Sequence, residues 1–175
     1  MENMKSTKEF LDKIKSYKES DKIDLSSKED LAIGIMNLIS IEEHLFFTYE
    51  KTKKEKYLNM ANEVREMRKK YLAMIVKNPE GEIWCISKHL LAASMRLIEV
   101  GTKKNNENKK EEAKDLFDNA FNLWNLFWGL NLDLIGIDDI KQNEETDIKL
   151  EKGQKTSIFS GLGRIINKIL DCCRE

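Results

Sequence analysis

A single proline, Pro79, interrupts a chain of 175 residues that also holds only eight glycines. Proline breaks a helix because it lacks the backbone N–H and clashes with the preceding turn, and glycine weakens a helix. The long segments between these residues are rich in leucine, methionine, lysine and glutamate, which favour helices. An alternating run rich in valine, isoleucine and threonine, which would indicate a strand, is absent from the sequence. These features predict an all-α fold.

Apolar residues recur every three or four positions in six segments, which is the spacing of one face of a helix. The predicted helices cover residues 6–19, 27–52, 54–77, 80–101, 110–131 and 156–173. The four long central helices have short connections, so we expect an up-down-up-down four-helix bundle. Ser26 and Glu29 make a predicted capping box before the first long helix. Gly101 is a predicted C-terminal stop.

This organisation divides the chain into four regions. We expect an N-terminal accessory helix in residues 1–25 and the four-helix bundle in residues 26–135. Residues 136–155 form a predicted acidic linker, because residues 138–151 hold six acidic residues against two lysines. Residues 156–175 contain a predicted C-terminal amphipathic helix. Its apolar stripe consists of Ile158, Phe159, Leu162, Ile165, Ile166, Ile169 and Leu170.

The segment 83–100 is one of the most apolar long stretches, and we expect it to be the central helix of the bundle. Residues placed 100° apart give this helix two apolar faces, one that includes Leu90 and one that includes Leu91. A helix with two apolar faces packs between neighbours. A narrow polar strip separates the faces, and any chemistry of this helix must lie there. The strip consists of Glu82, Cys85, His89 and Arg96.

Cys85 and His89 are four residues apart, so both side chains leave the helix on the same side. Sulfur and imidazole nitrogen are zinc ligands, and Glu82 lies one turn before Cys85. A complete site needs a ligand from another helix, for which Glu43 is a candidate. The simpler interpretation has no cofactor, with Cys85 half-buried and His89 bonded to a carboxylate. The alternative is a transition-metal site, for zinc or iron, with Cys85, His89, Glu82 and Glu43 as ligands.

A catalytic role for Cys85 would need His44 or His89 as the base. No glycine-rich turn or predicted helix N-terminus lies beside Cys85, where it would activate the thiol or bind an oxyanion. We therefore predict no catalytic residues and expect a protein that is not an enzyme.

Two adjacent carboxylates, Glu42 and Glu43, lie on an otherwise apolar helix. A buried carboxylate must be paired or its pKa must shift. We expect ion pairs with Arg65, Arg68 or Arg96. A second cluster, on the last long helix, is aromatic, and its helical spacing predicts a place in the core. Its members are Phe117, Phe121, Trp124, Phe127 and Trp128.

The charge balance and the targeting signals limit the partners and the location. The formal net charge is −1, and the basic residues of segment 51–77 are interleaved with glutamates, so nucleic acid is not an expected partner. The first residues contain no apolar signal region. Charges break the longest apolar runs before the ~20 residues that span a bilayer. Three cysteines make no disulfide framework. We expect a cytoplasmic protein.

The C-terminal helix suggests a function. A linker followed by an amphipathic helix is the organisation of a docking peptide. We therefore expect a non-enzymatic protein–protein interaction or adaptor module that docks through this helix onto a protein partner or a second copy. Two other destinations stay open: the bundle itself, or a membrane surface contacted by residues 156–173. The other functional hypothesis is a bundle that binds a metal or small ligand through Cys85, His89 and nearby glutamates.

Overall fold

The computed structural model describes residues 25–77 and 81–136. Over these ranges the protein is all α, as predicted, with four helices and no strand. They are α2 (Leu25–Thr52), α3 (Lys56–Leu72), α4 (Glu82–Asn106) and α5 (Lys110–Asn131). The predicted accessory helix, the acidic linker beyond Gly136 and the C-terminal helix lie outside the described residues.

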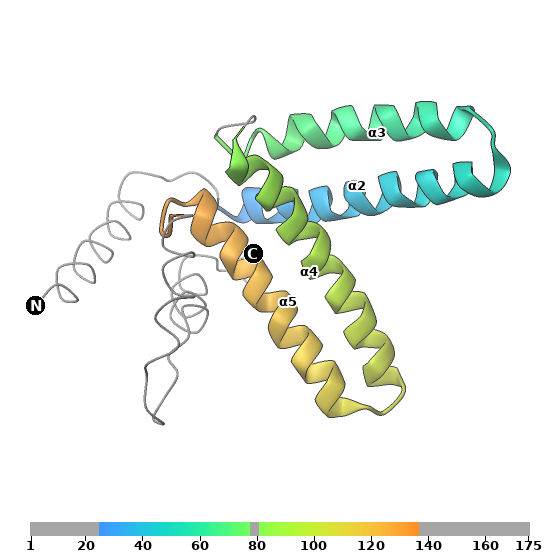
Figure 1. Cartoon of the computed structure of the whole chain (residues 1–175). Helices are drawn as coiled ribbons and strands as arrows, with labels where there is room; N and C mark the ends of the chain where they lie inside the picture. Colours follow the sequence, from blue (N-terminus) through green and yellow to red (C-terminus); the bar gives the residue numbers. More distant parts are fainter. Residues whose placement is uncertain (1–24, 78–80, 137–175) are drawn as a thin grey trace, which may run out of the picture.

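The four helices form two antiparallel hairpins, α2 with α3 and α4 with α5 (Figure 1). The hairpins meet where α2 and α4 begin and α3 and α5 end, and they diverge from there (Figure 1). Consecutive helices alternate in direction, but a single bundle of four helices side by side is not confirmed. Periodicity shows which face of a helix is apolar, whereas side-chain shape at each contact sets the crossing angle.

The hydrophobic core fills the end where the hairpins meet. It combines the first halves of α2 and α4, the turn after α3 and the last turns of α5. The Phe127 and Trp128 rings pack edge to face there, with centroids 5.1 Å apart. The largest fully buried side chains are Trp128, Phe127, Ile35, Leu72 and Leu91. The outer half of each hairpin is therefore a pair of helices away from this core.

This position of the core explains the mixed outcome for the aromatic cluster. Phe127 and Trp128 are buried, and Trp124 is partly buried against them. Phe117 and Phe121, by contrast, are 37% and 43% exposed. Phe117 lies on the outer half of α5 and Phe121 at its middle, before the last turns that enter the core. The prediction of core positions is right for the second half of the cluster and wrong for these two phenylalanines.

Small side chains line the contact between α4 and α5. Ser87, Ser94 and Gly101 recur every seven residues on α4 and are buried, as are Ala113 and Ala120 on α5. Ser94 Oγ donates a hydrogen bond of 2.5 Å to the carbonyl oxygen of Ala120. Small residues at a helix contact let the two backbones approach closely. We call this contact the α4/α5 seam.

Gly101 belongs to the seam and does not end α4, so the predicted stop is wrong. The helix continues to Asn106, and Gly101 is buried inside it. A Cβ added at this position would lie 2.7 Å from the ring of Phe117. Gly101 thus makes room for a side chain of the neighbouring helix, although glycine weakens a helix interior by about 1 kcal/mol relative to alanine.

The other boundaries agree closely with the sequence pattern. α5 covers the predicted residues, and α2 begins at Leu25, one residue before the predicted cap. α3 ends five residues earlier than predicted, at Leu72. A turn follows, and its residues Ile75 and Val76 are buried in the core. The apolar pattern therefore continues past the helix, because the turn packs into the same core.

Candidate functional site

The polar strip of α4 is exposed to solvent. Glu82, Cys85 and His89 lie on one helix as predicted, and all three are exposed, so Cys85 is not half-buried. Within residues 25–77 and 81–136, no three His, Cys, Asp or Glu side chains converge closely enough to hold a metal ion. Glu43, the expected fourth ligand, is paired with Arg96 instead. The predicted metal ligands are therefore not brought together within the described residues, and the metal site stays a prediction.

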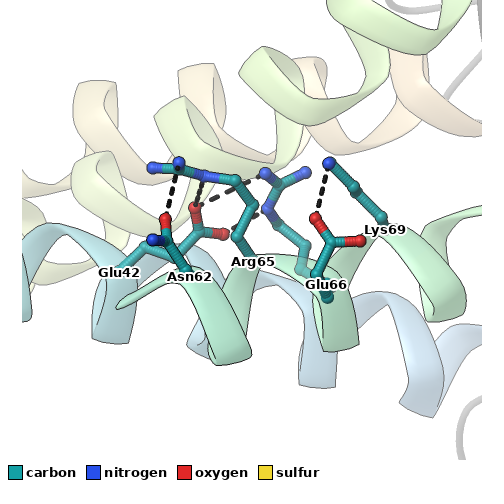
Figure 2. Close-up of polar contacts among 6 residues, drawn as sticks. Glu42, Asn62, Arg65, Glu66 and Lys69 are labelled. Atoms are coloured by element: carbon teal, nitrogen blue, oxygen red, sulfur yellow. Dashed lines mark hydrogen bonds and ion pairs between the residues drawn. The ribbon is translucent and has the colours of Figure 1, made fainter. Parts of the chain in front are cut away.

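Glu42 is clamped by two arginines of α3 (Figure 2). Arg65 Nε donates a hydrogen bond of 3.0 Å to Glu42 Oε2, and Arg68 Nε donates to Glu42 Oε1. The side chains of Arg68 and Glu42 are only 8% and 13% exposed. The predicted pairing of Glu42 is confirmed. Because all the donors are on α3, the clamp fixes α2 against α3 and has a structural role.

The neighbouring carboxylate, Glu43, points to the other hairpin. Arg96 of α4 donates one hydrogen bond to Glu43 and a second, of 2.6 Å, to Glu99 Oε2. These bonds raise the pKa of Arg96 above its ordinary, already high value, so the guanidinium stays charged. The predicted pairing of Glu43 with an arginine is also confirmed. This ion pair joins α2 to α4 where the hairpins diverge.

An open cleft of about 610 Å³ lies beside this ion pair, between α2 and α4. Four apolar side chains line it: Ile41, Leu45 and Phe47 from α2, and Met95 from α4. Polar side chains complete the lining, namely Asn37, Ser40, Glu43, His44, Arg96 and Glu99. His44 thus faces the cleft, whereas Cys85 is not among the lining residues. We call this feature the α2–α4 cleft.

α2 exposes a large apolar surface. Four of its large hydrophobic side chains are exposed: Ile33, Ile41, Phe46 and Phe47. The stretch Ser27–Thr52 is long and apolar enough to cross a membrane by length and composition, a test that core helices of soluble proteins also pass. Only 22% of its most apolar window is buried. Glu42 and Glu43 interrupt this run, as expected, and the stretch meets the length and hydropathy criteria with these two charges in it.

Comparison of the chain with protein-family models, curated proteins and solved structures finds no match. Sequence reasoning missed the α2–α4 cleft, because helices of different hairpins form it and no single-helix pattern contains it. The signal that pointed toward it was the apolar surface of α2, which covers more than half of the helix circumference.

Proposed function

We propose that the protein is a non-enzymatic interaction or adaptor module of the cytoplasm that binds other proteins through helix–helix contacts. The observation that carries this proposal is the exposed apolar surface of α2 beside the α2–α4 cleft. An apolar surface of this kind needs a cover, and an amphipathic helix laid in a groove is a common one.

The docking element of this module is the predicted amphipathic helix at 156–173. Its apolar stripe requires a partner surface. The predicted acidic linker before it would allow the helix to contact a surface at a distance from the described helices. Full burial of each large aliphatic side chain contributes about 1.5–3 kcal/mol, so a few of the stripe residues suffice for a stable contact. The partner is a protein with an apolar groove or a second copy of this chain.

Two matched variants of the full-length protein test this role. Helical spacing places Ile166 on the apolar stripe and Asn167 away from it, so Ile166→Asp and Asn167→Asp add the same charge on different faces. We expect Ile166→Asp to remove co-purifying proteins or self-association, measured by quantitative mass spectrometry and light scattering, while Asn167→Asp retains them. If both variants match the unaltered chain, the docking role is wrong.

The proposed cytoplasmic location has its own test, because α2 is apolar enough to span a membrane. After cell fractionation, we expect the full-length protein in the soluble fraction, since Glu42 and Glu43 in the middle of α2 are paired with arginines. Recovery in the membrane pellet after washing with alkaline carbonate would contradict this location and indicate insertion of α2.

A further inference from the structure

We propose that, in the free protein, the chain's own C-terminal amphipathic helix, residues 156–173, occupies the α2–α4 cleft. A partner then competes with the cleft for the same apolar stripe, so the docking helix is held back until it is displaced. This inference rests on the proposed function, because it uses the same helix as the docking element.

The cleft has apolar lining residues on both helices, which a third helix would cover. Ile41 and Phe47 of α2 are 44% and 52% exposed beside Met95 of α4, so a helix laid between α2 and α4 would cover apolar surface from both. Residues 37–47 of α2 extend about 15 Å along the cleft. The stripe from Ile158 to Ile169 has nearly the same length, about 16 Å as a helix.

The tether begins at a suitable place. Leu134 and Ile135 pack at the core with Ile35, so the described chain ends at Gly136, near the first half of α2. Residues 137–155 then separate Gly136 from the helix. A random coil of 19 residues has a root-mean-square span of about 25 Å, and a fully extended chain of that length reaches over about 60 Å. The helix can therefore reach the cleft of its own chain.

Tethering also favours occupation of the cleft by the helix of the same chain over occupation by the helix of a second copy. A short flexible linker gives its ligand an effective concentration in the millimolar range. At micromolar protein, the intramolecular contact is therefore formed in preference to the same contact between two copies. A partner needs higher affinity for the stripe than the cleft has, or a high local concentration, to displace it.

Charge supports the same occupant. From Lys152 onward the chain holds five basic residues against two acidic ones. The cleft presents two carboxylates, Glu43 and Glu99, against the single charge of Arg96. Opposite net charges steer the helix toward the cleft and fix its approach, while apolar burial supplies most of the affinity.

Hydrogen–deuterium exchange of the full-length protein tests this contact. We expect protected amides in residues 156–173, and at least tenfold faster exchange of the same amides in Ile41→Lys. Ile98→Lys is the matched control, because Ile98 is also 44% exposed but does not line the cleft. It should leave the protection unchanged. Phe47→Glu serves as a second cleft variant should Ile41→Lys lower the melting temperature.

Equal exchange in the unaltered chain and both cleft variants would overturn the proposal. A photo-cross-linking residue at Phe47 identifies the occupant, and we expect cross-links to 156–173 within one chain. Cross-links between two chains would show a second copy in the cleft and overturn the intramolecular contact. Protection that appears only with anionic vesicles would assign the helix to a membrane surface instead.

The two proposals fail separately. If the cleft variants have no effect but Ile166→Asp still loses partners, the docking role survives and the intramolecular contact is wrong. If the cleft variants release residues 156–173 but Ile166→Asp retains every partner, the contact is right and the docking role is wrong.

Discussion

The α4/α5 hairpin and the α2/α3 hairpin hold their helices together by different means. In the first, the seam of small residues brings the backbones close and a buried serine bonds the opposite helix. In the second, few side chains of α3 are buried, and an ion-pair clamp on Glu42 fixes the two helices. Small residues at every seventh position join α4 and α5 along their length, whereas the clamp is a polar attachment at one position of two helices that also lie side by side (Figure 1).

This difference accompanies the exposed apolar side chains of α2. A clamp sets the position of α3 without covering the rest of α2, so Ile33, Ile41 and Phe47 stay exposed. The seam also leaves some apolar residues uncovered on the outer half of its hairpin, such as Ile98 and Phe117. On α2, the exposed side chains of Ile41 and Phe47 line the α2–α4 cleft.

The largest expected effect comes from breaking the clamp. Glu42→Ala leaves the buried Arg68 without its carboxylate partner, and we expect a loss of about 3 kcal/mol in the free energy of unfolding. Glu43→Ala is the neighbouring control, and because its ion pair is 43–44% exposed we expect a loss under about 1 kcal/mol. Urea unfolding measures both. Equal losses would show that the clamp contributes no more than a surface ion pair.

Breaking the seam should cost somewhat less. Ser94→Leu places a large side chain where α4 and α5 approach closely, and overpacking of this kind costs about 2 kcal/mol. Ser94→Ala is the matched control, which loses only the hydrogen bond to Ala120, worth about 1 kcal/mol. The same unfolding measurement separates them. A leucine variant as stable as the alanine variant would mean that the seam has space to spare.

Replacement of one buried amide side chain of α5 should increase the stability of the protein. Asn125 is fully buried, and neither of its side-chain polar atoms has a hydrogen-bond partner among the residues described. Asn125→Leu removes the unsatisfied groups at similar volume, so we expect the free energy of unfolding to rise by about 1 kcal/mol. The exposed Asn119→Leu should change it by less than about 0.5 kcal/mol. A clear loss in Asn125→Leu would reveal a required hydrogen bond at this position.

The smallest effect concerns pH and lies on α2. Burial, and then the charge of Asp30, raise the pKa of Glu29 above its ordinary value of 4.5. The folded state therefore binds the proton more tightly than the unfolded state, and stability falls as pH rises through the raised pKa. Glu29→Gln should be more stable than the parent at pH 7, and this gain should vanish below pH 4.5. Thermal melts across pH 3–7 measure it, and a pH-independent gain would contradict the assignment.

The sequence predicted well whatever depends on one helix and its charges. The all-α class, the bounds of α5 and the arginine partners of Glu42 and Glu43 follow from periodicity and from the cost of an unpaired carboxylate. Apolar packing between helices was predicted poorly. In the sequence, a glycine such as Gly101 can mark either the end of a helix or a close contact between helices. Only the position of Phe117 shows that Gly101 is a close contact.

The α2–α4 cleft belongs to the second group. Its lining residues come from Asn37–Phe47 of α2 and Met95–Glu99 of α4. The angle at which the two hairpins diverge leaves the cleft between these helices. In the polar strip of α4, Cys85 and His89 are exposed outside this cleft, whereas Arg96 lines it. Residue chemistry alone therefore did not point to the α2–α4 cleft, because residue types can be read from a sequence and the crossing angle of two helices cannot.

The location of the core at one end has a consequence for how the protein tolerates changes in length. The connections at the far ends, around Lys53 and Asn108, adopt left-handed backbone conformations on the surface, far from the core. Insertions of whole helical turns there would lengthen a hairpin without moving a core residue, as exposed loop tips generally permit. Either hairpin can therefore differ in length among variants of this chain, while the end where the hairpins meet, which positions the α2–α4 cleft, stays the same.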